Sequence, residues 1–324
     1  MKKSFLFFCT LCTSVLLYAD GLTATLQQGE KMTPFYGVDA FYQAYQAADS
    51  GAVITLSAGT FTRVDTIKKS LTIIGSGAMN IGNQYNTSFD LAYIVADNVV
   101  LEGVRYTNLY LSNINNCLIK RSYIQYLRAN AYHTNTLIEQ SYIGNEYALG
   151  WSKNYSIRNS YIGKFSSSNN ASNIAYITNN YINNFNNSVR PVAIYKKNIF
   201  ECTKISTYNN KNYTVSLTSP SEFYDNMILN FGFYYAGTYY THSLQGASGT
   251  IFENNRSGTI TTNTTHNKIP TPNYLALDST YIGPLGGMGV SDYPAIPRVI
   301  SKKIDEQTNE DGKINVSITV NVEK

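Results

Sequence analysis

The sequence predicts an all-β fold, a solenoid of stacked parallel coils with an N-terminal capping helix and a small C-terminal β appendage. The main observation is a recurring phrase that starts with asparagine and has apolar residues three and eight positions later. It begins at Asn98, Asn116, Asn135, Asn154 and Asn173, at intervals of 18, 19, 19 and 19 residues. A fixed period of about 20 residues is typical of stacked supersecondary units. Because the apolar runs are short and separated by polar bends, the units are expected to be strands.

The first 19 residues are predicted to be a signal peptide. Lys2 and Lys3 form a basic start, residues 5–17 are mostly apolar, and Ala19 is a small residue at the cleavage edge. This run is too short for a membrane span, and no later apolar run approaches that length. We therefore expect a mature chain without a transmembrane segment. It would be secreted, or located at the outer surface or in the periplasm of a Gram-negative bacterium.

Composition argues against a nucleic-acid partner. Only 14% of the 324 residues are charged, and the formal net charge is +4. Lys2 and Lys3 account for part of that excess, and no clustered basic stripe follows them. Only Cys117 and Cys202 follow the leader. Roughly four coils would separate them, about 20 Å at strand spacing, so we expect two buried thiols rather than a disulfide.

Residues 20–265 are predicted to form the parallel β-helix domain, including its cap. Residues 38–48 carry apolar side chains at helical spacing, and this helix would cover the open end of the first coil. Residues 52–56 and 71–74 predict the first strands, and the coils run from 98 to about 260. The residues expected to point inward are Ile119, Ile124, Ile138, Ile143, Ile157 and Ile162.

The later part of the chain is less regular. Strand character persists at 191–199, 223–228 and 251–256, while 201–220 and the tyrosine-rich stretch 234–240 are expected to be insertions. Residues 266–324 would form a closing segment and tail. In this tail, 314–322 alternates apolar and polar residues as a half-buried strand does, and 299–304 is its expected hairpin partner.

Three segments carry a resemblance to a known family. They are Gly51-Ala-Val-Ile-Thr-Leu-Ser-Ala-Gly-Thr-Phe61, Leu71-Thr-Ile-Ile-Gly-Ser-Gly77 and Tyr281-Ile-Gly-Pro-Leu-Gly-Gly287. Together with the repeats, they resemble right-handed parallel β-helix proteins of the pectin-lyase-like superfamily, in particular exported or surface proteins of Bacteroidetes-like bacteria. The resemblance implies the fold. It leaves activity open, because the superfamily contains lyases, hydrolases, esterases and adhesins.

Catalytic residues are sparse in the coils. A polygalacturonase-like hydrolase would need neighbouring carboxylates, and the coils contain no Asp-Asp pair. A lyase would need a base and a way to neutralise a uronate, with Ca²⁺ in the commonest form of that chemistry. The candidate residues for a lyase are Arg128, His133, Glu146, Lys153 and Arg158. Without lyase activity, no metal or other cofactor is expected.

Two polar columns are expected to be structural. The asparagines that begin the phrase would stack as a ladder at a bend, because asparagine tolerates left-handed backbone angles. The residues four positions after each asparagine are Glu102, Lys120, Glu139 and Arg158. Their signs alternate from coil to coil, which predicts a ladder of cross-strand ion pairs.

The best candidate for recognition is an aromatic column. Tyr123, Tyr142, Tyr161 and Tyr181 each precede an inward isoleucine, so they are expected to face outward and stack at strand spacing. Trp151 lies in a bend and could extend this surface. The favoured interpretation is an exported protein that binds a polysaccharide, a cell-surface glycan or a surface protein through this face. The alternatives are a polysaccharide lyase or other glycan-cleaving enzyme, and a purely structural surface fibre.

Overall fold

The computed structural model describes residues 21–78, 86–166, 173–183, 192–201, 212–216, 220–229, 233–235, 238–245, 247–258, 275–280, 282–284, 298–304 and 316–321. Within them the chain forms stacked parallel coils, so the all-β solenoid predicted from the sequence is confirmed. The signal peptide and Cys202 lie outside the described residues. Those expectations, together with the domain boundaries, stay predictions.

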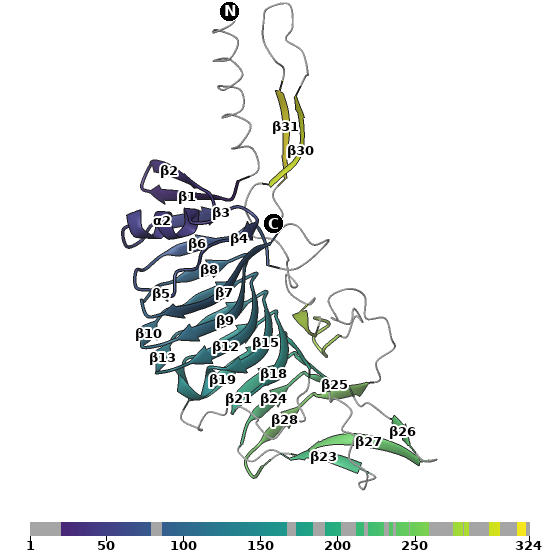
Figure 1. Ribbon diagram of the computed structural model, residues 1–324. Coiled ribbons are helices and arrows are strands. Elements are labelled where there is room, and N and C mark those ends of the chain that lie inside the picture. Colours follow the sequence, from purple (N-terminus) through teal and green to yellow (C-terminus); the bar gives the residue numbers. More distant parts are fainter. Residues whose placement is uncertain are drawn as a thin grey trace, which may run out of the picture.

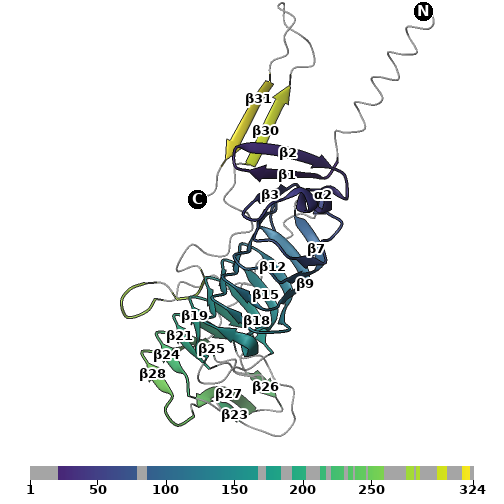
Figure 2. The same cartoon turned by 90° about the vertical axis from the view of Figure 1, so that its left-hand side faces the viewer.

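Two long sheets form the walls of the solenoid (Figures 1 and 2). Among the described residues, sheet A has 12 strands in this spatial order: β2 (Lys31–Tyr36), β1 (Thr23–Gln28), β3 (Val53–Leu56), β6 (Thr72–Ile74), β8 (Val100–Glu102), β11 (Leu118–Lys120), β14 (Leu137–Glu139), β17 (Ser156–Arg158), β19 (Ala175–Thr178), β21 (Ala193–Lys196), β24 (Glu222–Tyr224) and β28 (Ile251–Glu253).

Sheet B runs alongside it and carries the candidate site. Its described strands, in spatial order, are β4 (Gly59–Thr60), β7 (Thr87–Ile94), β9 (Val104–Leu111), β12 (Tyr123–Ala129), β15 (Tyr142–Tyr147), β18 (Tyr161–Phe165), β20 (Tyr181–Asn183), β22 (Ile199–Glu201), β25 (Met227–Leu229) and β29 (Arg256–Gly258), and β5 (Thr66–Ile67) also pairs with β7. A short sheet C joins three central coils through β10 (Ile114–Asn115), β13 (His133–Thr134) and β16 (Ser152–Lys153), with the 3-10 helix η1 (Leu149–Trp151) before β16.

The core consists of files of identical side chains, one per coil. The six isoleucines predicted to point inward each have a relative exposure of 0%. Register pairs Ile119 with Ile138 and Ile124 with Ile143, so each file continues through the stack. Complete burial of one such side chain stabilises the fold by about 1.5–3 kcal/mol. The period of the sequence therefore translates directly into a continuous apolar interior.

Two elements close the N-terminal end. The predicted helix is present as α2 (Ala40–Ala47), which buries Phe41 and Tyr45 against the first coils. An antiparallel hairpin of β1 and β2, not predicted from the sequence, pairs with β3. Its turn is at Gly29, whose φ of 60° suits glycine. The hairpin covers the strand edge that the first coil would otherwise expose.

The predicted asparagine ladder is confirmed for four of its five members. Asn98, Asn116, Asn135 and Asn154 have φ between 51° and 58°. Amide nitrogens of three of them donate to the preceding asparagine's oxygen at 2.9–3.1 Å. The prediction was wrong for Asn173. Because the next coil is one residue longer, Ser156 pairs with Tyr176 and the position in line with Asn154 is occupied by residue 174.

A second, buried ladder lies at the bend between sheets A and B. Its members come directly after the bend residues with positive φ, and they are Ser122, Ser141, Ser160, Asn180, Asn198, Asn226 and Asn255. Each side-chain oxygen from Ser141 onward accepts the backbone N–H of the preceding member, at 2.8–3.1 Å. The ladder thus satisfies backbone donors that the bend removes from the sheets.

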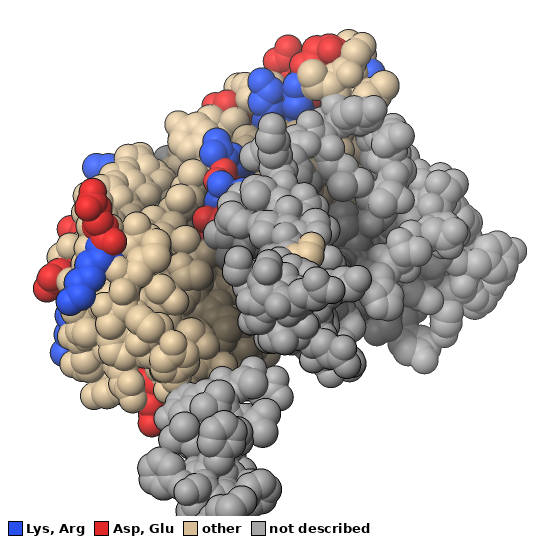
Figure 3. Space-filling model, turned by 90° about the horizontal axis from the view of Figure 1, so that it is seen from above, with Lys and Arg blue, Asp and Glu red and all other residues tan. Residues whose placement is uncertain are grey.

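The predicted ion ladder on sheet A is confirmed from Lys120 to Arg158, whereas Glu102 forms an ion pair with Arg121 at 3.2 Å. Lys120 lies between Glu102 and Glu139 in register, and Glu139 pairs in turn with Arg158. Ion pairs join Lys120 to Glu139 at 3.6 Å and Arg158 to Glu139 at 2.6 Å. Seen from above, acidic and basic residues lie close together among uncharged ones (Figure 3). These charged residues therefore pair with one another between successive coils.

The two expected insertions meet each other. β23 (Asn212–Ser216) from the first pairs in parallel with β27 (Thr238–Gln245) from the second, and β26 (Phe233–Tyr235) pairs antiparallel with β27. In the tail, β30 (Arg298–Ile304) and β31 (Val316–Asn321) form the antiparallel hairpin expected from their alternation. Both views place this hairpin toward the end of the solenoid that carries β1 and β2 (Figures 1 and 2).

Candidate ligand-binding face

The tyrosine column, made of Tyr123, Tyr142, Tyr161 and Tyr181, lies in register on the outer side of sheet B. Each tyrosine precedes a buried isoleucine, and successive residues of a strand point to opposite faces. Ring centroids are 4.5, 4.6 and 5.5 Å apart, and the planes differ by 1°, 5° and 15°. The column is therefore a rigid stack of parallel phenol rings.

Only the first half of the tyrosine column is accessible. Tyr123 and Tyr142 are half-buried, whereas Tyr161 and Tyr181 are 2% and 1% exposed. Residues 275–280 and 282–284, which we call the C-terminal strap, supply Ala276 and Ile282 to the apolar cluster that covers the second half. The expectation that all four tyrosines form an exposed surface therefore holds for two of them.

The C-terminal strap is fixed by polar contacts with Lys197. The Lys197 ammonium donates to Asp278 and to Thr280, both at 2.6 Å, and the Lys197 carbonyl accepts the Gly283 N–H at 2.8 Å. The hydrogen bond from Lys197, with those from Thr280, holds the pKa of the Asp278 carboxyl well below its usual range. Asp278 is thus anionic near pH 7.

Cations frame the accessible tyrosines. The Arg105 guanidinium lies over the Tyr123 ring at 4.3 Å and continues the stack toward the N-terminal end. Burial raises the pKa of Tyr123, an effect that the neighbouring Arg105 charge partly offsets. Burial also raises the pKa of Tyr142. Both phenols are therefore neutral near pH 7, and the Tyr123 hydroxyl donates to Gln125 at 2.6 Å.

A second aromatic column lies further along the same strands. Register aligns Tyr93, Tyr110, Arg128 and Tyr147 on β7, β9, β12 and β15. The Tyr93 and Tyr110 rings stack at 4.6 Å. Between the two aromatic columns lies a more polar one, which consists of Asn108, Tyr126, Asn145 and Lys164. From β9 to β15 the outer face of sheet B therefore combines flat apolar rings with amides and cations.

The second column was missed in the sequence, although a signal exists. Tyr110, Arg128 and Tyr147 each come 12 residues after an asparagine of the recurring phrase. Because this position alternates between tyrosine and arginine, a comparison based on identical residues does not find the repeat. Position 12 had to be compared by its shared outward direction rather than by residue type.

Two of the five residues proposed for a lyase lie inside the solenoid. His133 is 1% exposed, and its ring nitrogens contact Thr136 at 2.9 Å and the Ala148 carbonyl at 3.0 Å. Burial lowers the pKa of His133, so the imidazole is neutral near pH 7. Glu146 is 0% exposed and accepts the N–H groups of Ala148 and Leu149, both at 2.7 Å. Neither side chain is accessible to a polymer.

The other three proposed residues lie on different faces. Arg128 is on the outer side of sheet B, Lys153 is exposed on sheet C, and Arg158 belongs to the ion ladder of sheet A. The five residues are therefore not brought together. Across the described part of the chain, no group of three or more His, Cys, Asp or Glu side chains is placed to hold a metal ion.

Trp151 lies on a separate exposed corner. Its ring is 44% exposed and meets the ring of Tyr132, which is 67% exposed, edge to face at 5.5 Å. The pair precedes sheet C strands on neighbouring coils, since His133 and Ser152 are in register. Trp151 therefore forms an aromatic corner with Tyr132, a residue that the sequence did not single out.

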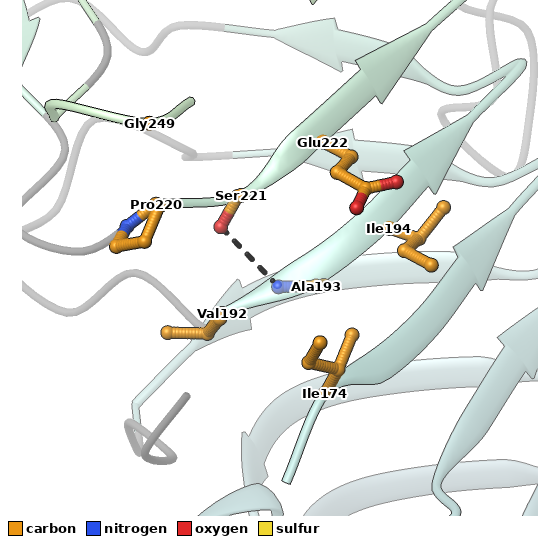
Figure 4. Close-up of a pocket in the computed structure, with 8 residues that line it drawn as sticks. All are labelled: Ile174, Val192, Ala193, Ile194, Pro220, Ser221, Glu222 and Gly249. Carbon is orange, nitrogen blue, oxygen red and sulfur yellow. Dashed lines mark hydrogen bonds between the residues drawn. The ribbon is translucent and has the colours of Figure 1, made fainter. Parts of the chain in front are cut away.

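A small pocket lies on sheet A, away from these columns. It has a volume of about 160 Å³ and is lined by residues of β21 and β24 and of the segments that precede β19, β21, β24 and β28 (Figure 4). Ile174, Val192 and Pro220 give it an apolar wall, while the Ser221 hydroxyl accepts the Ala193 N–H at 3.3 Å. Glu222 contributes the one carboxylate of the lining. Its carboxylate accepts the Tyr224 hydroxyl at 3.0 Å, and a single carboxylate in the lining does not by itself make a catalytic constellation.

The fold and this face define the chain as a parallel β-solenoid with an aromatic and cationic outer surface. No protein-family model, curated protein or solved structure matches the sequence. None of the helices among the described residues has the length and apolar character to cross a membrane.

Proposed function

We propose that this protein is an exported, glycan-binding β-helix that acts at the cell surface through the outer face of sheet B from β9 to β15. The observation that carries the proposal is the flat, rigid arrangement of Tyr123 and Tyr142 beside a second aromatic column. Stacked rings offer contact area without the loss of side-chain freedom that flexible residues incur. Amides at Asn108 and Asn145 lie between the columns, where they can bond to hydroxyl groups.

A glycan suits this face better than a compact metabolite does. The columns extend over several coils, whereas the pocket on sheet A lies elsewhere and is small. A polymer of sugar rings can contact both columns at once, with apolar ring faces on phenols and hydroxyls on amides. The N-terminal leader expected from the sequence is consistent with an extracellular ligand.

The test is glycan binding by the chain from Asp20 onward, compared with a Tyr123→Ala, Tyr142→Ala double variant. Loss of two aromatic contacts, each worth about 0.5–1.5 kcal/mol, is expected to weaken binding about 5- to 150-fold. Tyr176→Ala is the matched control, since Tyr176 is an exposed tyrosine (49%) on the outer side of sheet A. Equal loss in both variants, or no binding to any glycan on an array, would contradict the proposal.

The same material tests the lyase alternative. Incubation with uronate-containing polysaccharides, with and without Ca²⁺, should yield no absorbance from an unsaturated product. The reason is that His133 and Glu146 are enclosed and the remaining candidates point to three different faces. Product formation would replace binding with cleavage as the function of this scaffold.

A further inference from the structure

Arg128 is held by aromatic rings on three sides. Its guanidinium carbon lies 4.9 Å from the ring centroid of Tyr147, 5.2 Å from that of Tyr126 and 5.9 Å from that of Tyr110. Tyr110 and Tyr147 come from the coils before and after, and Tyr126 precedes Arg128 by two residues on β12. We call these four side chains the arginine cage.

The cation in the cage has no counter-charge among the residues that the structure describes. Within the described residues no carboxylate forms an ion pair with Arg128, and its buried Nε has no hydrogen-bond acceptor. The contrast with other arginines is direct. Arg63, Arg121 and Arg158 pair with carboxylates at 2.6–3.2 Å.

The surrounding face is also short of acids. Arg105 and Lys164 share it with Arg128, and among described residues neither forms an ion pair. On the outer side of β7 to β20, within the residues that the structure describes, the one carboxylate is Asp90, which pairs with Arg63 at 3.1 Å. Among these described residues the accessible face therefore has an excess of positive charge, unlike the alternating ladder on sheet A.

Cation–π contacts position Arg128 but leave its hydrogen-bonding capacity unused. Such contacts contribute about 0.5–2 kcal/mol each and fix the guanidinium against the rings. They provide no acceptor for its N–H groups. Because Nε is enclosed, an incoming acceptor would meet the terminal nitrogens, and a carboxylate or sulfate matches their planar donor geometry.

We propose that Arg128 is the anion-recognition residue of this face and that the ligand is an acidic polysaccharide. Its carboxylate or sulfate group binds the arginine cage while its sugar rings contact the tyrosines. The inference rests on the proposed function, since it names the ligand class of the same face. Carboxylate and sulfate share the chemistry that the cage recognises, so the choice between them is left to the experiment.

The experiment measures binding of the wild-type chain and Arg128→Gln to alginate, dextran sulfate and unsubstituted dextran by affinity electrophoresis and calorimetry. We expect wild type to bind alginate or dextran sulfate at least tenfold more tightly than dextran. Arg128→Gln should lose at least tenfold for the acidic polymer and change dextran binding little. Which acidic polymer responds identifies the group as carboxylate or sulfate.

Controls separate recognition of an anion from general effects of charge. Arg158→Gln removes an exposed arginine (49%) of the opposite sheet and should leave affinity unchanged. Arg128→Lys keeps the charge without the planar fork and should recover part of the affinity. It also keeps the test decisive if Arg128→Gln fails to fold. Equal loss in Arg128→Gln and Arg158→Gln would overturn the inference.

Outcomes for the two proposals differ. The inference would be overturned, and glycan binding retained, if dextran bound as tightly as the acidic polymers and the Tyr123→Ala, Tyr142→Ala double variant still bound dextran more weakly than wild type. Absence of binding to all three polymers and to a glycan array would overturn both. Salt should weaken wild-type binding to the acidic polymer more than it weakens Arg128→Gln, because one ion pair is then missing.

Discussion

Replacement of Asn198 by leucine should remove a central rung of the buried ladder. The Asn198 side-chain oxygen accepts the Asn180 backbone N–H at 2.9 Å, and its amide nitrogen donates to the Ile177 carbonyl at 2.6 Å. Asn198 is 0% exposed, so water cannot replace these partners. Leucine has a similar shape, which keeps the cavity term small. The Asn180 N–H and the Ile177 carbonyl lose this partner, and the side-chain contacts with Asn180 and Asn226 are lost as well.

The expected cost follows from those two groups. Each buried, unsatisfied donor or acceptor costs about 1–3 kcal/mol, so the variant should lose about 2–6 kcal/mol of stability. For a chain of this size, about 2 °C of Tm per kcal/mol gives a decrease of about 4–12 °C. Calorimetry or circular dichroism at a fixed heating rate measures this shift.

The exposed ladder supplies the control. Asn135→Gly introduces the residue type that best tolerates the φ of 51° at this position. It removes the amide hydrogen bonds to Asn115 and Asn116, which lie in a solvated position. Its Tm should decrease by about 1–2 °C, since exposed hydrogen bonds contribute little. Equal shifts for Asn198→Leu and Asn135→Gly would refute the assignment of stability to the buried ladder.

Two further predictions concern close packing and acid stability. A Cβ on Gly163 would lie 2.2 Å from the Gly144 carbonyl oxygen, so Gly163→Ala should cost about 1–3 kcal/mol of stability by forcing the coils apart. Gly21→Ala is the control, because a Cβ on Gly21 meets open space. A Gly163→Ala Tm equal to that of the wild type would contradict the clash. His133 has a lowered pKa in the folded protein, so the unfolded chain binds more protons, and stability should decrease as pH falls below about 6.5. Urea midpoints between pH 8 and pH 5 measure this, and His133→Gln should show a shallower acid dependence; an unchanged slope would exclude His133 as the source.

The sequence predicted what repeats with a constant period. The isoleucine files, the ion ladder and four members of the asparagine ladder all follow from one step of about 19 residues, because equal spacing places equal positions above one another. The buried ladder follows the same spacing but changes from serine to asparagine at Asn180. Both types present an oxygen to a backbone N–H, a shared property that residue identity conceals.

What the sequence missed depends on contacts between distant segments or on direction within a coil. The C-terminal strap reaches Lys197 from about 80 residues later, with no repeat to indicate the pairing. Glu146 occupies a column whose other members include Leu109, Leu127 and Phe165. A carboxylate in an otherwise apolar column indicates an inward side chain, and attention to that column would have removed Glu146 from the accessible candidates.

The near-constant coil has a consequence for how such a chain can change in length. In the central region each coil pairs with the one before and the one after. Excision of one whole period beginning at Asn135 would bring Asn154 onto Asn116, amide to amide, with the isoleucine and serine files still continuous. Duplication of the same period would add one coil and keep these files in register. The length of the outer face can therefore evolve by whole coils, independently of the cross-section of each coil.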